Sequence, residues 1–250
     1  MNREVTSFGT SVVLLYHRIG PMKLSSHVAG QYVCPRVFAW GIDGLRQGKW
    51  QATSLDACIK YGTEGGENSE DHFAITFDDG YLSVYEHACP ILKDRDMTAT
   101  VYVVVDTLGG INLWDKRAGD KEEKMMSADQ ARELAESGFE IGSHTLTHPR
   151  LANLNDDELI REIVDSKQKL EDIIQQDVTS LSYPYGNFDG RVLNAAAAAG
   201  YKNAVSTKLG TIIEGTSMFE IPRINVRWNG FGWHLRRKIR RATRATEIQT

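Results

Sequence analysis

Two histidines and two carboxylates form the most chemically suggestive pattern in the sequence. His144 and His148 are four residues apart, and a Thr-Phe-Asp-Asp-Gly run places Asp78 and Asp79 directly after an apolar segment. Zinc and related divalent ions take imidazole nitrogens and carboxylate oxygens, and a catalytic metal site keeps one position open for water. His144, His148 and Asp79 therefore make a complete three-ligand set. Asp78 is left over, and a purely structural metal site has no need of a second carboxylate.

Each half of this pattern also has an ordinary structural interpretation. A His-x-x-x-His pair often consists of surface or core residues, and Asp-Asp-Gly is typical of a turn because Gly80 favours one. Joined together at strand ends, the two motifs favour a metal site. Neighbouring residues that leave a strand point in different directions, so one aspartate is expected to bind the ion. The other is expected to act as the base that removes a proton from a metal-bound water.

Short β-rich runs alternate with segments of helical period, which predicts a largely parallel α/β fold. Capping-box patterns at 127–130 and 155–158 predict helix starts, and Gly138 and Gly200 fall where helices should end. Repeated βα units favour a distorted (β/α)7-type barrel over an open sheet. Seven runs are expected to be strands: 12–16, 73–77, 100–105, 139–142, 179–183, 204–207 and 220–226.

The candidate functional residues lie where such a barrel places its chemistry. Reactive groups gather at the carboxyl ends of parallel strands, where the following loops converge on one mouth. Residues 62–71 and 108–124 are predicted to be surface loops, and Trp114 in the second is the aromatic residue best placed to line the mouth. The residues expected there are Asp78 and Asp79 after 73–77, His144 after 139–142, Pro184 and Tyr185 after 179–183, His17 after 12–16, and Arg223 in the last strand.

The bulk composition indicates one domain that spans residues 1–250. The hydrophobic share of 41% is ample for a sizeable core, and a formal charge of −4 gives no basic field of the kind that nucleic acid binding requires. Cys34, Cys58 and Cys89 have no CxxC spacing, so we expect them to be buried, reduced thiols.

The two ends of the chain bear on its location. No run approaches the roughly 20 apolar residues of a membrane span, and the N-terminal apolar run is too short for a signal peptide. A cytoplasmic protein is expected, or a secreted one if a leader has been removed. Residues 236–250 form a basic tail, either a helix or a frayed end. We expect a solvated face there, with weak contact to anionic lipid as the alternative.

Taken together, these residues resemble the polysaccharide deacetylase family, also called the NodB-homology or carbohydrate esterase family 4 domain. The resemblance extends from the Leu-Leu-Tyr-His-Arg run around His17 to the Ile-Pro-Arg run that ends at Arg223. The first family motif, TFDDG, stands at 76–80. It implies that Asp78 is the catalytic base and that Asp79 is a metal ligand.

The second family motif, HS/TxxH, stands at 144–148. It implies that both histidines are metal ligands and that Thr145 steadies the loop between them. The resemblance also implies a barrel fold, a carbohydrate substrate that carries N-acetyl groups, and a divalent metal. Zinc is the expected ion, with Co2+, Ni2+, Mn2+ or Fe2+ as alternatives that the same ligand set tolerates.

The third family motif departs from its usual form. The family pattern is close to Arg-x-Pro-Tyr-Gly, whereas residues 182–186 read Ser-Tyr-Pro-Tyr-Gly, so that Ser182 occupies the position of the arginine. The resemblance implies that the backbone N–H of Tyr185, next to Pro184, helps to stabilise the tetrahedral oxyanion. Arg223 is expected either to replace the missing arginine beside the catalytic aspartate or to pair with a surface carboxylate.

A second departure concerns the general acid. Many relatives carry a late Leu-x-x-His motif whose histidine protonates the leaving amine, and no such motif follows Val205. His17 and His234 are the remaining candidates, and His17 is better placed because it follows the first strand. A hydrogen-bonding role in the core is an equal alternative for His17. A third route returns the proton through Asp78.

These observations favour a metal-dependent hydrolase that removes N-acetyl or other N-acyl groups from amino sugars of a polysaccharide, oligosaccharide or glycoconjugate. An O-acetyl esterase is the second hypothesis, because an alkoxide leaves more easily than an unprotonated amine and needs less help from an acid. The third is a catalytically silent carbohydrate-binding protein on the same scaffold.

Overall fold

A curled parallel sheet forms the centre of the fold. The structure, a computed structural model, describes residues 9–64 and 70–249, and within these ranges eight strands form one sheet in the order β10-β1-β5-β6-β7-β8-β9, with β4 paired to β5. A separate pair of short strands, β2 and β3, lies beside it. The strands are β1 Ser11–Tyr16, β2 Arg18–Ile19, β3 Tyr32–Val33, β4 Gln51–Ala52, β5 His72–Phe77, β6 Thr100–Val103, β7 Glu140–Ser143, β8 Ser180–Ser182, β9 Asn203–Val205 and β10 Ile224–Asn225.

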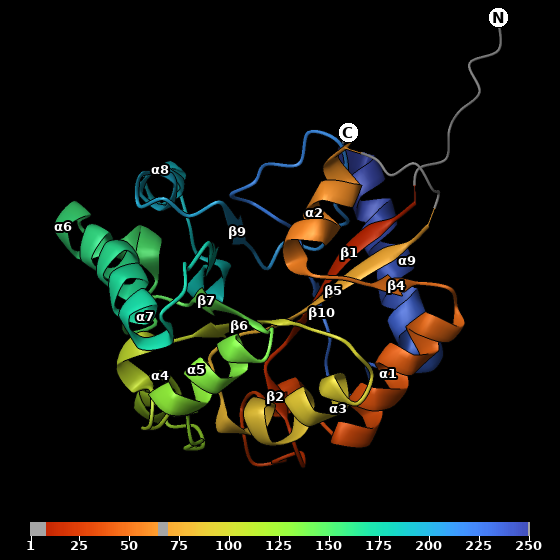
Figure 1. Ribbon diagram of the computed structural model, residues 1–250, viewed down its shortest axis with the longest axis horizontal. Coiled ribbons are helices and arrows are strands. Elements are labelled where there is room, and N and C mark those ends of the chain that lie inside the picture. Colours follow the sequence, from red (N-terminus) through yellow and green to blue (C-terminus); the bar gives the residue numbers. More distant parts are fainter. Residues whose placement is uncertain (1–8, 65–69, 250) are drawn as a thin grey trace, which may run out of the picture.

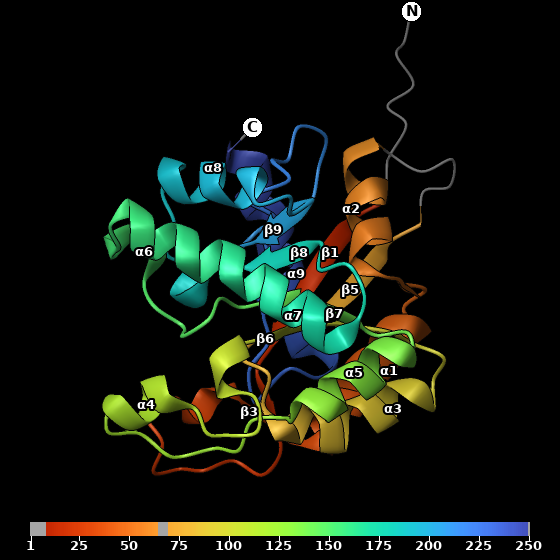
Figure 2. The ribbon, with the colours of Figure 1, turned by 60° about the vertical axis from the view of Figure 1, so that its left-hand side comes forward.

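The helices surround this sheet on the outside, as Figure 1 and the turned view in Figure 2 show. Figure 2 also shows α6 and α7 as one nearly continuous rod, which a π-helical turn at Arg161–Asp165 joins. The helices are α1 Pro35–Gln47, α2 Leu55–Glu64, α3 Cys89–Lys93, α4 Leu113–Arg117, α5 Ala128–Glu136, α6 Asp156–Ile160, α7 Ser166–Ile174, α8 Gly190–Ala198 and α9 Gly232–Gln249.

The two central strands, β1 and β5, are buried on both faces. Their sequences, Ser-Val-Val-Leu-Leu-Tyr and His-Phe-Ala-Ile-Thr-Phe, are nearly continuous apolar runs, and all six residues of each strand are buried. Such runs are typical of parallel strands that are covered on one side by helices and on the other by the barrel interior. The strands pair in register from Ser11 with His72 to Tyr16 with Phe77, so their carboxyl ends are level.

A short stretch, residues 221–226, closes the barrel, and we call it the closing segment. At one end Ile221 forms a parallel bridge to Val205 of β9, and the N–H of Ser206 donates to the carbonyl of Ile221 at 2.8 Å. At the other end β10 pairs with β1, and the N–H of Val226 donates to the carbonyl of Leu15 at 2.8 Å. The parallel, barrel-like α/β fold that the sequence predicts is confirmed.

The barrel interior contains a buried chain of polar groups. The hydroxyl of Tyr102 lies 2.6 Å from Oγ of Ser180, and Ser180 donates to Oδ1 of Asn203 at 2.6 Å. Gly142 on β7 gives the Tyr102 ring its space, because a Cβ at that position would lie 2.5 Å from Cε1 of the ring. The network therefore depends on a residue without a side chain.

The structure confirms the two predicted capping boxes and shifts several boundaries. Ser127 and Asn155 cap α5 and α6 through reciprocal bonds with Gln130 and Glu158. The last predicted strand, 220–226, shortens to Ile224–Asn225, because Pro222 has no N–H to donate to a ladder.

The prediction that residues 62–71 and 108–124 are surface loops was partly wrong. The 108–124 stretch contains α4, a short helix, and residues 62–64 complete α2, while 65–69 lie outside the described residues.

The structure corrects the prediction for one cysteine and decides between the two predictions for the basic C-terminal stretch. Cys58 and Cys89 are buried, but Cys34 is exposed at the residue before α1. The basic stretch from residue 236 is not frayed, since it belongs to α9 and packs on α1 through Leu235 and Ile239, which are buried. Within residues 9–64 and 70–249, none of the helices combines the length and apolar character that a bilayer crossing needs.

Replacing Gly142 by alanine tests the importance of the crowded interior. Gly142→Ala should lower the free energy of unfolding by about 1–3 kcal/mol, because the new methyl group has to displace the Tyr102 ring. Urea unfolding followed by circular dichroism measures the change. Gly190→Ala is the matched control, since no heavy atom lies within 4 Å of its Cβ position, and equal losses in the two variants would contradict the packing argument.

Candidate metal and catalytic site

Asp79, His144 and His148 converge at the carboxyl ends of β5 and β7. Oδ1 of Asp79 lies 3.4 Å from Nε2 of His144 and 3.4 Å from Nε2 of His148. All three residues are buried, and their ligand atoms lie within 4.8 Å of one another. Tetrahedral zinc with bonds of about 2.0–2.2 Å holds its ligand atoms roughly 3.3–3.6 Å apart. Both separations from Asp79 therefore fit a zinc-like divalent ion.

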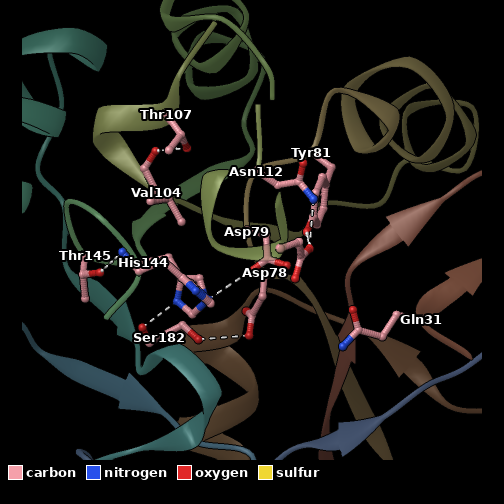
Figure 3. Close-up of polar contacts among 12 residues, drawn as sticks. Gln31, Asp78, Asp79, Tyr81, Val104, Thr107, Asn112, His144, Thr145 and Ser182 are labelled. Atoms are coloured by element: carbon pink, nitrogen blue, oxygen red, sulfur yellow. Dashed lines mark hydrogen bonds and ion pairs between the residues drawn. The ribbon is translucent and has the colours of Figure 1, made fainter. Parts of the chain in front are cut away.

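The loop that carries the two histidines is fixed by hydrogen bonds to its neighbours. Nδ1 of His144 lies 2.7 Å from the carbonyl of Ser182, which leaves Nε2 as the nitrogen turned toward Asp79 (Figure 3). Hydrogen bonding of this kind orients metal-binding imidazoles in proteins. The N–H of His148 donates to Oγ1 of Thr145 at 3.2 Å, which agrees with the steadying role expected for Thr145.

Glu162, from the π-helical turn between α6 and α7, holds the same loop from behind. One carboxylate oxygen accepts the N–H groups of Leu146 and Thr147 at 2.9 and 3.0 Å, and the other accepts the Thr147 hydroxyl at 2.6 Å. Glu162 is only 8% exposed. Three donors from one loop on one buried carboxylate make Glu162 the main anchor of the segment between the two histidines, a role that its sequence context did not reveal.

Asp78 is held by the buried guanidinium of Arg223. The two side chains form a bidentate pair, with both N–O distances at 2.7 Å, and Ser182 donates its hydroxyl to the same carboxylate at 3.1 Å. Arg223 also donates to Oγ1 of Thr76 at 3.1 Å, to the carbonyl of Ser206 at 2.8 Å and to Oγ of Ser182 at 3.0 Å. Of the two expectations for Arg223, the structure shows contact with Asp78.

The electrostatics of the site keep both aspartates ionised. Burial is the largest single influence and would raise the pKa of Asp78, but the charge of Arg223, the charge of His144 and the hydrogen bonds from Arg223 together bring the pKa below its ordinary value. Burial is also the largest single influence on Asp79 and would raise its pKa, but hydrogen bonding to His144 and His148, together with the charges of His17 and His148, holds that pKa well below its ordinary value. Burial lowers the pKa of His17, whose Nδ1 has no partner among the described residues, so its imidazole is neutral near pH 7.

The backbone of the site is bent into the left-handed region. Among the described residues, seven other than glycine have a positive φ, and four of them belong to this site: Asp79 at 77°, Thr145 at 69°, His148 at 64° and Tyr185 at 59°. Each such residue costs on the order of 1–3 kcal/mol. Strain of this kind concentrates at functional sites. Here three of the four residues, Asp79, His148 and Tyr185, line the same cavity.

These residues open into a cavity of about 220 Å3. The Trp114 ring packs on the His148 ring with the ring centres 4.3 Å apart, and the Tyr185 ring makes an edge contact with the same histidine at 4.5 Å. His17, Asp115, Thr207 and Asn225 complete much of the wall. Trp114 therefore lines the mouth as expected, although it does so from the helix α4.

Not every candidate residue lies at this cavity, and some that do were missed. Pro184 is buried in the turn Pro184–Gly186 behind Tyr185, and His234 stacks on Trp233 in α9 instead of lining the cavity. Asp115 went unnoticed because its stretch was interpreted as a loop. Asn225 lies two residues after Arg223 in a predicted strand, and the alternation of strand residues could have indicated that its side chain leaves the strand on the same side as that of Arg223.

A profile of the polysaccharide deacetylase family matches residues 65–204, which is more than half of the chain. The chain belongs to this family. Its defining TFDDG and histidine motifs lie within the matched region, and in the structure they meet at the cavity just described.

Two curated relatives of this family member match about two thirds of the chain. YxkH of Bacillus subtilis (strain 168) is 31% identical over 164 residues, which covers 66% of this chain and 54% of that protein. The poly-β-1,6-N-acetyl-D-glucosamine N-deacetylase of Staphylococcus aureus (strain MSSA476) is 25% identical over 176 residues, which covers 63% of this chain and 58% of the relative. The chain thus spans little more than half the length of these relatives.

Solved structures of other deacetylases share the fold. The Streptococcus pyogenes deacetylase PplD in complex with acetate has a TM-score of 0.78 at 24% identity, over 93% of this chain and 99% of that one. IcaB from Ammonifex degensii has a TM-score of 0.75 at 22% identity, over 88% and 93% of the two chains. At such identities, these likenesses show the fold of this deacetylase family member alone.

Removing the Glu162 anchor should loosen the metal-binding loop. Glu162→Ala is expected to weaken divalent metal binding by about 10- to 100-fold, because the loop that carries both histidines is no longer supported from behind. Glu162→Gln, which keeps an acceptor, should recover most of the affinity. Competition with a metallochromic chelator measures both, and Glu136→Ala on the exposed face of α5 is the control. Unchanged affinity in a folded Glu162→Ala variant would refute the anchoring role.

Proposed function

We propose that the chain is a metal-dependent hydrolase that removes N-acetyl groups from amino sugars of a glycan or glycoconjugate. The observation that carries the proposal is the position of Asp78. It is an ionised carboxylate beside a three-ligand metal set, yet Arg223 and not the metal set holds it. A metal site that served only to stabilise the fold would need no such group. Membership of the polysaccharide deacetylase family supports the same reaction class.

In this proposal each candidate residue has a distinct task. Asp79, His144 and His148 would hold a divalent ion, with zinc as the expected one, which would polarise the acyl carbonyl and lower the pKa of a water. Asp78 accepts the proton of the attacking water, and the bidentate contact with Arg223 keeps its carboxylate oriented during this step. The backbone N–H of Tyr185 donates to the oxyanion that develops at the acyl carbon.

The amine that leaves needs a proton, and we assign its return to Asp78. His17 lies on the cavity wall, but burial lowers its pKa, and a neutral imidazole is a poor acid. Asp78 gains a proton in the attack step and can pass it to the amine in the next. His17 then serves as a hydrogen-bonding group in the cavity wall.

The substrate class follows from the relatives and from the cavity. The Staphylococcus aureus relative is named for the N-deacetylation of poly-β-1,6-N-acetyl-D-glucosamine, and we extend an N-acetylated amino sugar to this chain. The aromatic rings of Trp114 and Tyr185, which both line the cavity, suit the faces of a sugar ring. O-acetyl ester cleavage is a second candidate, because the chain lacks the late Leu-x-x-His motif that protonates an amine in many relatives.

The role of Asp78 can be tested by Asp78→Asn. We expect acetate release to fall at least about 100-fold while divalent metal binding persists, because the amide has the same shape but cannot accept the proton. The variant also leaves the buried charge of Arg223 uncompensated, so the free energy of unfolding should fall by about 3–5 kcal/mol. Acetate release and metal-binding calorimetry, at a temperature where the variant remains folded, measure activity and metal affinity. Urea unfolding measures the loss of stability.

Asp177→Asn, at an exposed position, is the matched control for loss of one carboxylate. Acetate release at the wild-type rate by folded Asp78→Asn would overturn the assignment of the base. Loss of metal binding together with activity would instead place Asp78 among the ligands.

The reaction itself is tested by metal removal and a panel of substrates. Dialysis against a chelator should abolish acetate release from N-acetylglucosamine oligomers, and added Zn2+ or Co2+ should restore it. Acetylated xylan in parallel separates N- from O-deacetylation, since faster release from xylan would favour the esterase. Binding of oligomers without acetate release from either substrate, with metal present, would contradict both reactions.

A further inference from the structure

A second cavity, which we call the basic groove, lies beside the catalytic one. It measures about 260 Å3, and its wall includes Thr207, Asn225, Lys238 and Arg241. Thr207 and Asn225 also line the catalytic cavity, so the two spaces share a wall. The basic groove is therefore adjacent to the catalytic cavity.

The basic groove is built by the contact between α9 and the closing segment. Nζ of Lys238 donates to the carbonyl of Asn225 at 2.8 Å, which fixes α9 against β10. Arg241 lies three residues after Lys238, and such residues are neighbours on one face of a helix. Arg227 is exposed and lies two residues beyond Asn225 on the same extended stretch. Arg227 is not part of the wall of the groove, but Arg223 of the closing segment is, so the wall contains cations from two elements.

Among the cations in the wall of the basic groove, Arg223 pairs with Asp78, but Lys238 and Arg241 have no acidic partner among the described residues. Within residues 9–64 and 70–249, no ion pair joins Arg227, Lys238 or Arg241 to a carboxylate, although the chain as a whole has a formal charge of −4. Partial burial, together with the charges of Arg227 and Arg241, lowers the pKa of Lys238. Like charges held together without counter-charges cost free energy, which a bound anion would recover.

We propose that the basic groove binds a phosphate group of the substrate, and that the substrate is an N-acetylated amino sugar joined to phosphate. This rests on the proposed deacetylation. Lys238 and Arg241 supply charged donors, and Thr207 and Asn225 add a hydroxyl and an amide at the shared wall. Phosphate, with several acceptor oxygens and up to two negative charges, matches such a donor set better than a single carboxylate does.

The groove also explains how charge would select the substrate. The catalytic cavity itself contains Asp78 and Asp115, which are each paired with an arginine, and Asp79, which is not, so an anion at the metal site would depend on the metal. A phosphate in the basic groove would lie apart from these carboxylates and near the cations of α9. The sugar would then be oriented with its phosphate toward α9 and its acetamido group toward Asp78.

Binding of inorganic pyrophosphate tests the groove without any need for catalysis. Calorimetry on the full chain should show affinity about 100-fold lower in the double variant Lys238→Gln/Arg241→Gln, because each charge-assisted hydrogen bond to the anion contributes roughly tenfold. Arg240→Gln is the matched control, because Arg240 belongs to the same helix but lines a different cavity with Trp50 and Trp233. Its affinity should match the wild type. Equal affinity in the double variant and in the wild type would overturn the proposal.

Turnover provides the second readout. The ratio of kcat/KM for N-acetylglucosamine 1-phosphate to that for its neutral methyl glycoside should exceed one in the wild type and in Arg240→Gln. In the double variant this ratio of kcat/KM values should be about 100-fold lower than in the wild type, because the variant binds the anion more weakly by the same factor. UDP-N-acetylglucosamine and a short-chain prenyl diphosphate of N-acetylglucosamine distinguish a nucleotide from a lipid as the source of the phosphate.

The two experiments separate the groove from the reaction. Pyrophosphate binding that depends on Lys238 and Arg241, without acetate release from any substrate, would refute the proposed deacetylation but support the anion site. Acetate release at equal kcat/KM from charged and neutral sugars would keep the deacetylation and refute the role of the groove.

Discussion

The rest of the structure depends on one buried ion pair, between Asp78 and Arg223. Both side chains are almost fully enclosed, and removing two charges from water costs several kcal/mol for each ion unless the pairing is close and the remaining donors are satisfied. Here the pairing is bidentate, and Thr76, Ser182 and Ser206 take up other donors of the guanidinium. Because Arg223 lies in the closing segment, the same contact orients a candidate catalytic group and joins the two sides of the barrel.

Two adjacent aspartates, both buried and both ionised, define the electrostatic problem that this site solves. Arg223 pairs directly with Asp78, whereas the ion-pair contacts of Asp79 among the described residues are with His144 and His148, and Arg18 acts on it without such a contact. A divalent ion at this position would supply the missing positive charge, which agrees with the spacing of the donor atoms. The left-handed backbone at Asp79 and His148 directs these side chains to the same point, so the site accepts local strain in exchange for close spacing.

Much of the fold and the central residues of the site could be predicted from the sequence. Apolar runs followed by polar residues located the ends of β1, β5, β7 and β8, because the hydrophobic period and the rule for parallel strands act locally. What could not be predicted depended on contacts between distant residues. The partner of Arg223 lies 145 residues away, and the anchoring by Glu162 crosses from a helix to a loop. The α4 helix is short and rich in charge, so its sequence resembles that of a loop.

The position of the closing segment also has a consequence for the order in which the molecule forms. Asp78 is synthesised 145 residues before Arg223. During synthesis the strands from β1 to β9 can associate while the barrel stays open along one side and the carboxylate of Asp78 remains hydrated. Contacts of such high sequence separation form late, because the entropy of closing a long loop has to be met first. The nascent protein would therefore close its barrel and orient Asp78 in the same step. Chains that do not complete this step would lack both the closed barrel and the catalytic geometry.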